Sequence, residues 1–146
     1  MRFRRGLSRF FPWLFLLFCL FSLTACAPSA PDVRILVDGQ AWEGQLRAPE
    51  TGPAVAVSLG DQLLLTLPFG EAHTVRLLQP GVGENTLVLT EDGVSMTEAD
   101  CPGQDCIRMG TVTRENWAIR PLGGFIICLP HHLTVEVRNM LSEAQP

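Results

Sequence analysis

Three cysteines and two histidines gather in one stretch of the sequence, and no other part of the chain holds so many side chains capable of chemistry. They are Cys101, Cys106, Cys128, His131 and His132. Thiols form disulfides, thiols and imidazoles bind zinc, and a stabilised thiolate carries out redox reactions. The stretch therefore predicts one of three things: a structural thiol cluster, a metal site or a redox centre. We also expect the three thiols to lie together, where a short helix packs on the closing strand.

The structural interpretation is favoured, as a disulfide or as buried thiols that pack like small apolar groups. A helix predicted over 102–109 would place the Cα atoms of Cys101 and Cys106 roughly 7–9 Å apart at ~1.5 Å rise per residue. A disulfide requires at most about 7 Å, so Cys128 is the predicted partner for either one, unless Gly103 breaks the helix. Such a bridge closes a loop of over ~20 residues and stabilises the fold by about 3 kcal/mol.

A Cys3His metal site is the second interpretation, with zinc or iron–sulfur held by Cys101, Cys106, Cys128 and His131, or by His132 in place of His131. The sequence Cys-x4-Cys followed by one distant cysteine lacks the paired spacing of a zinc ribbon. This departure argues against zinc, and the main expectation is a chain without a metal or other cofactor.

A redox centre is the third interpretation, because Cys101 would lie near the N-terminus of the predicted helix, where a thiolate is stabilised. Asp100 and Asp105 lie close in the sequence and would oppose a second negative charge. The chain also lacks a Cys-x-x-Cys motif. No catalytic residues are therefore predicted.

Short alternating segments between glycine and proline turns dominate the rest of the chain, which is the pattern of half-buried strands. We predict strands over 33–37, 41–46, 54–59, 62–67, 73–78, 85–90, 94–99, 117–120, 125–128 and 133–138. The predicted fold class is mainly β: a small barrel or sandwich of short antiparallel strands, with one short helix near 102–109.

The first 25 residues are predicted to be a secretory signal, with four arginines ahead of an almost wholly apolar run over 10–23. The run ends in Leu23-Thr24-Ala25-Cys26, which resembles a bacterial lipobox. We therefore predict a lipoprotein-type signal peptide over 1–25, a lipidated Cys26 and a tether that ends at residue 32. An uncleaved signal anchor is the alternative.

Charge excludes some classes of partner. The leader contains four of the eleven basic residues and none of the fifteen acidic ones, so the formal charge changes from −4 to −8 once it is removed. All the basic residues are arginine. Nucleic-acid binding needs a basic face, and docking on anionic lipid needs a basic segment, so neither is expected. The predicted membrane attachment therefore depends on the lipid anchor.

Three segments together resemble the NusG domain II family: "VRILVDG", "GENTLVLTEDGVSMTEADCPGQDCIRMG" and "FIICLPHHLTVEV". The resemblance covers about 33–138 and leaves a tail over 139–146. It implies a compact β-rich domain, and it does not imply a role in transcription. The segment 47–79 is longer than the family pattern, and 117–124 replaces a shorter turn.

These observations predict a lipid-anchored module at the extracytoplasmic face of a bacterial membrane. Its expected role is non-enzymatic: binding to, or assisting, an unidentified protein partner at the membrane surface. The alternative is a redox-active or metal-binding lipoprotein that uses Cys101, Cys106 and Cys128.

Overall fold

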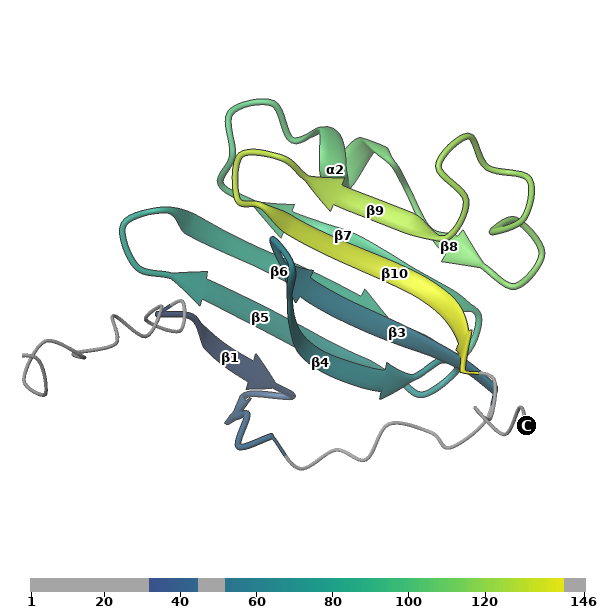
Figure 1. The fold of residues 1–146 in the computed structure, drawn as a ribbon, viewed down its shortest axis with the longest axis horizontal. Helices are drawn as coiled ribbons and strands as arrows, with labels where there is room; N and C mark the ends of the chain where they lie inside the picture. The colour runs from purple at the N-terminus through teal and green to yellow at the C-terminus, as the bar shows by residue number, and fades with distance from the viewer. Residues whose placement is uncertain (1–31, 45–51, 141–146) are drawn as a thin grey trace, which may run out of the picture. The chain divides into compact units, whose positions relative to one another are not determined.

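The computed structural model describes residues 32–44 and 52–140, which form two antiparallel β-sheets and one short helix (Figure 1). The six-stranded sheet has the order β2-β1-β5-β6-β7-β8. Its strands are β1 (Arg34–Val37), β2 (Gln40–Ala41), β5 (His73–Gln79), β6 (Gly83–Leu89), β7 (Gly93–Ala99) and β8 (Val112–Thr113). The mainly β fold predicted from the sequence is confirmed.

The second sheet has four strands in the order β4-β3-β10-β9. Its strands are β3 (Gly52–Leu59), β4 (Gln62–Pro68), β9 (Phe125–Cys128) and β10 (Leu133–Met140). β10 pairs with β3 along its whole length, from Leu133 opposite Leu59 to Met140 opposite Gly52. It pairs with β9 on its other side. The last strand thus joins segments that are far apart in the sequence.

Alternation along the strands builds the core. In β5, Val75 and Leu77 are fully buried, whereas Thr74 before them and Arg76 between them are exposed. Since successive side chains of a strand point to opposite faces, this pattern directs one face of the sheet inward. Buried residues of both sheets then join in a single apolar cluster that includes the three cysteines.

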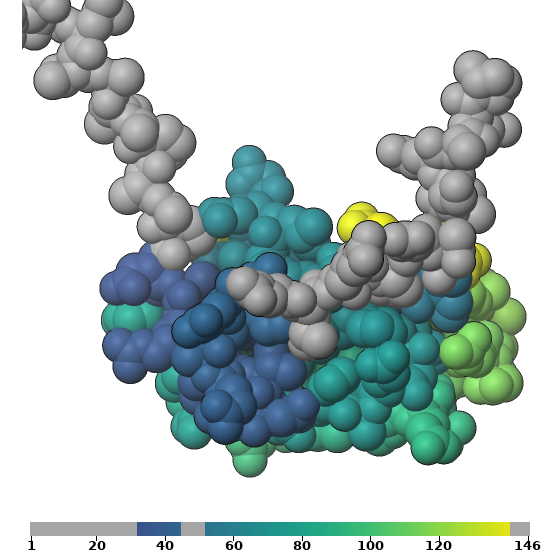
Figure 2. Space-filling view, turned by 90° about the horizontal axis from the view of Figure 1, so that it is seen from below, coloured from purple at the N-terminus to yellow at the C-terminus, as the bar shows by residue number. Residues whose placement is uncertain are grey.

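The first hairpin follows the predicted turn but is short. Asp38 and Gly39 adopt positive φ angles of 52° and 79° between β1 and β2. The return strand β2 has two residues, where the sequence predicted 41–46, and residues 45–46 lie outside the described part. Viewed from below, residues 32–44 form the dark blue surface at one side of the domain (Figure 2).

The helix α2 (Asp105–Arg108) is shorter than the predicted 102–109. Its N-cap is Gln104, which adopts the left-handed conformation with φ 51° and ψ 28°. A left-handed residue cannot lie inside a right-handed helix, so the helix begins only after it. The predicted helical start at residue 102 is therefore wrong, and Cys101 precedes the helix by several residues.

The predicted strand at 117–120 is also wrong, because these residues form turns. The carbonyl oxygen of Asn116 accepts hydrogen bonds from the backbone N–H groups of Ile119 and Arg120, both at 3.0 Å. These local bonds use the donors that a strand would offer to a neighbour. The loop between β8 and β9 is consequently a series of tight turns.

Several predicted features fall on residues that the structure does not describe. They include the signal peptide over 1–25, Cys26, most of the tether and the last part of the 139–146 tail. The strand β10 extends to Met140, two residues beyond the predicted end of the last strand. Among the described residues, no helix is long and apolar enough to cross a membrane.

Candidate functional site

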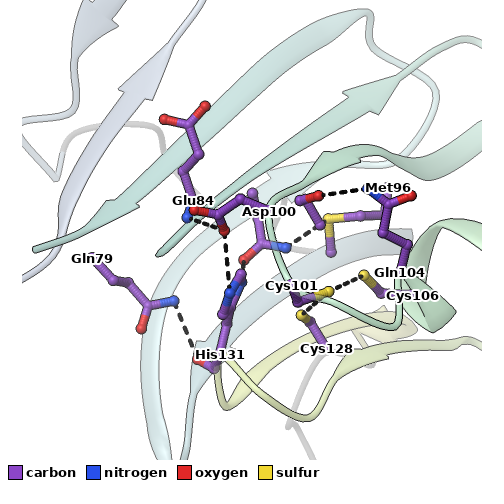
Figure 3. Close-up of polar contacts among 11 residues, drawn as sticks. Gln79, Glu84, Met96, Asp100, Cys101, Gln104, Cys106, Cys128 and His131 are labelled. Atoms are coloured by element: carbon purple, nitrogen blue, oxygen red, sulfur yellow. Dashed lines mark hydrogen bonds and ion pairs between the residues drawn. The ribbon is translucent and has the colours of Figure 1, made fainter. Parts of the chain in front are cut away.

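Three separate elements bring the cysteines together (Figure 3). Cys101 follows the end of β7, Cys106 lies in α2, and Cys128 is the last residue of β9. The Sγ atom of Cys101 lies 3.9 Å from that of Cys106 and 3.7 Å from that of Cys128. All three sulfurs lie within 4.8 Å of one another. The result is a closed triangle of thiols.

Contacts around Gln104 turn α2 toward the sheet. Its side-chain amide donates to the carbonyl of Ala99 at the end of β7, at 3.1 Å. Its own carbonyl accepts from the N–H groups of Ile107 and Arg108 in the first turn of the helix. The left-handed backbone of Gln104 reverses the chain between these anchors. Cys106 is thereby directed inward, toward Cys101.

Burial controls the chemistry of the thiols. Cys101 is 4 % exposed, and Cys106 and Cys128 are each 1 % exposed. Burial, followed by the contacts with Cys128 and Cys101, raises the pKa of Cys106 to about 12. Burial also raises the pKa of Cys128, although donors from Asn85 and the backbone of His131 oppose this shift. Both groups are therefore uncharged thiols at neutral pH.

The sulfur separations bear on the expected disulfide. A bond requires about 2.05 Å between sulfurs, and the three cysteines are free in the structure. The argument that a helix keeps Cys101 away from Cys106 is wrong, because Cys101 precedes α2. Cys106 and Cys128 lie at similar distances from Cys101, so geometry no longer favours one pairing. A bridge to Cys128 stays a prediction.

A second buried group lies beside the thiols and centres on His131, which is 3 % exposed. Its Nδ1 lies 2.7 Å from the Oδ1 of Asn85, and its Nε2 lies 3.2 Å from the Oδ1 of Asp100. The backbone carbonyl of His131 accepts a hydrogen bond from the side chain of Gln79 at 3.1 Å. The N–H of Glu84 donates to the same Asp100 oxygen at 2.8 Å.

The two histidines of the predicted Cys3His site do not face the sulfurs. Both ring nitrogens of His131 face oxygen atoms of Asn85 and Asp100. His132 is exposed in the turn between β9 and β10, where its φ is 52° and its carbonyl accepts from the N–H of Gly60. Among the described residues, the group with metal-ligand geometry contains only the three cysteines.

Two residues of this region were missed from the sequence, Asn85 and Gly83. Asn85 is fully buried in β6, with its amide nitrogen 3.4 Å from the Sδ of Met96. Asparagine is depleted in strands, so its position inside an apolar strand was a usable signal of a special contact. Gly83 lies against His131 and Asp100, where a Cβ atom would collide with both side chains.

The buried thiols should react slowly in the native protein. At pH 8, with a chelator present, iodoacetamide should modify Cys106 at least ~100-fold more slowly than in urea, since burial and a pKa near 12 suppress the thiolate. Mass spectrometry of the peptide that contains Cys106 measures the rate. Equal rates in the native and unfolded protein would contradict the buried cluster.

The comparisons with known proteins give a family match and several similar folds. The family model described as NusG domain II matches residues 15–140. A DUF1312 family protein from Enterococcus faecalis has 19 % sequence identity, a TM-score of 0.51, and coverage of 59 % of this chain and 95 % of its own.

The crystal structure of the Lin0431 protein from Listeria innocua gives 18 % identity, a TM-score of 0.52, and coverage of 62 % and 99 %. Both likenesses concern the fold. None of the curated proteins matches the chain. Because the family model covers most of the sequence, this chain belongs to the NusG domain II family.

Proposed function

We propose that the protein is a non-catalytic binding or accessory module, held by a lipid anchor at the extracytoplasmic face of a bacterial membrane. The observation that carries this proposal is the order of segments. An arginine-led apolar leader ends in Leu23-Thr24-Ala25-Cys26, and the first strand of the β domain begins shortly after it, at Arg34. A lipidated Cys26 would bring the domain to the membrane surface.

The chemistry of the described residues supports a non-catalytic role. A thiol nucleophile must be accessible and ionised, whereas Cys106 and Cys128 are buried and have raised pKa values. The ring of His131, the one buried imidazole of the described residues, faces Asn85 and Asp100 and does not face a thiol. The names of the similar structures state no activity.

Binding to a protein partner would use the surface of the domain. One hollow of about 680 Å³ lies beside the end of β5 and the turn before β6, and Arg34, Glu84 and Asp100 give it charges of both signs. Val82 at its edge is 54 % exposed. A mixed charged and apolar surface of this kind suits a protein partner better than a nucleic acid, which needs a basic face.

The anchor is tested by replacing Cys26 with serine. We expect Cys26→Ser to leave the membrane fraction or to accumulate as an unprocessed precursor, because serine cannot form the thioether to the lipid. Fractionation of cells, gel mobility and labelling with a radioactive fatty acid measure the outcome. Cys19→Ser, in the same leader, is the matched control and should be lipidated normally. Unchanged retention and mobility of Cys26→Ser would support a signal anchor instead.

A further inference from the structure

The triangle of thiols has the dimensions of a metal-binding site. With two edges of 3.7 and 3.9 Å and a third of at most 4.8 Å, a point equidistant from the sulfurs lies about 2.2–2.5 Å from each. A zinc–sulfur bond is about 2.3 Å long, which falls inside this range. The three sulfurs can therefore all bind one ion without moving apart.

We propose that Cys101, Cys106 and Cys128 form a mononuclear three-thiolate site for a soft monovalent cation, Cu(I). This site goes beyond the proposed anchoring function and does not depend on it. On binding, three S–H bonds break, three Cu–S bonds form and three protons leave to solvent. No electron is transferred, because the copper enters and stays as Cu(I).

A single ion fits the triangle better than an iron–sulfur cluster. In an iron–sulfur cluster the thiolates are divided among two or four iron atoms, so they lie around a body several atoms wide. Here all three sulfurs lie within 4.8 Å of one another and at most 4 % of any of the three residues is exposed. The packed core leaves no space for a cluster between them.

The number of ligands favours copper over zinc. Structural zinc is almost always bound by four protein ligands, and the group of metal-ligating side chains in the described residues has three members. His131, the nearest candidate in sequence, directs Nδ1 at Asn85 and Nε2 at Asp100. Soft thiolates bind both Cu(I) and zinc, but Cu(I) does not require a fourth ligand.

The surroundings of Cys128 suit a thiolate ligand. Asn85 and the backbone of His131 oppose the rise in the pKa of Cys128 that burial causes, and polar groups close to ligating atoms tune a metal site. The Oδ1 of Asn85 also lies 2.7 Å from the Nδ1 of His131, so the histidine network fixes the position of Asn85. Groups that lower the pKa of a thiol also favour the negative charge that three thiolates retain around one monovalent ion.

The test uses the full chain in detergent, with Cys19→Ser/Cys26→Ser as the parent so that only the cluster cysteines remain. Anaerobic titration with Cu(I) against the chelator bathocuproine disulfonate should give one copper per chain. X-ray absorption should show three sulfurs at about 2.2–2.5 Å from the copper. Cys101→Ser, Cys106→Ser and Cys128→Ser should each weaken binding at least ~10-fold, because each removes one soft ligand.

Val112→Ala is the control that distinguishes the loss of a metal ligand from a loss of stability. Val112 is fully buried in β8 and pairs with Val94 near the start of β7, at the other end of that strand from Cys101. The variant is expected to be less stable but to bind copper as the parent does. Failure of the folded parent to bind copper, or unchanged binding by the three serine variants, overturns the site. Preferential binding of zinc with a nitrogen or oxygen as fourth ligand overturns the assignment to copper.

Discussion

Gly83→Ala is expected to lower the free energy of unfolding by about 3 kcal/mol or more, the range of an overpacked core with a broken buried network. A Cβ atom at this position would lie 2.5 Å from the Oδ1 of Asp100 and closer still to the ring of His131. Real Cβ atoms essentially never approach within 3.0 Å, so the buried ring must leave its place. Urea unfolding followed by tryptophan fluorescence measures the loss.

Gly81→Ala is the matched control for this prediction. Gly81 lies in the turn just before Gly83, with a φ of +76°, and a Cβ atom there would meet nothing within 4 Å. Its replacement should cost only the backbone strain of a left-handed alanine, about 1–2 kcal/mol. If the two variants lost equal stability, the cost would come from the turn backbone, and the contact with His131 would have no special importance.

Asn85→Leu is expected to cost about 2–4 kcal/mol, although leucine has the same number and branching of side-chain heavy atoms as asparagine. The change removes the acceptor that lies 2.7 Å from the Nδ1 of His131 and leaves a polar nitrogen buried without a partner. Thermal unfolding followed by circular dichroism gives the change in stability. Because His131 is buried, its Nδ1 atom cannot form a hydrogen bond to water in place of the lost one.

Two further variants test whether the loss of stability comes from the missing contact between Asn85 and His131. Met96→Leu removes only the sulfur that Asn85 faces at 3.4 Å and should cost less than ~1.5 kcal/mol. The double variant Asn85→Leu/His131→Phe removes both polar partners, so it should lose less stability than the sum of the two single changes. Strict additivity would show that the two side chains do not interact.

Periodicity was sufficient to predict most strands. Val75 and Leu77 alternate with exposed residues in β5, and the turn at Gly60 and Asp61 separates β3 from β4 as expected. Alternation predicts which face of a strand is buried. It does not predict which strands pair, and for that reason the sequence left barrel and sandwich open.

The site depended on features that local patterns do not encode. Gln104 adopts a left-handed conformation that is uncommon for a residue other than glycine, and this conformation shortens the helix and turns Cys106 toward Cys101. Asn85 and His131 lie 46 residues apart and meet only because the two sheets enclose one core. The residue types showed which side chains are capable of chemistry, whereas the conformation of the backbone determines which of them are in contact.

The position of β10 between β3 and β9 has a consequence for how the domain forms. Neither β9 nor the β3–β4 hairpin has a neighbour on that side until the chain up to Met140 is present. Pairing β10 with β3 joins residues about 80 positions apart, a loop closure that slows folding. The early strands of this sheet therefore stay open while the rest of the chain is synthesised, which makes chaperone protection of the β3 edge valuable.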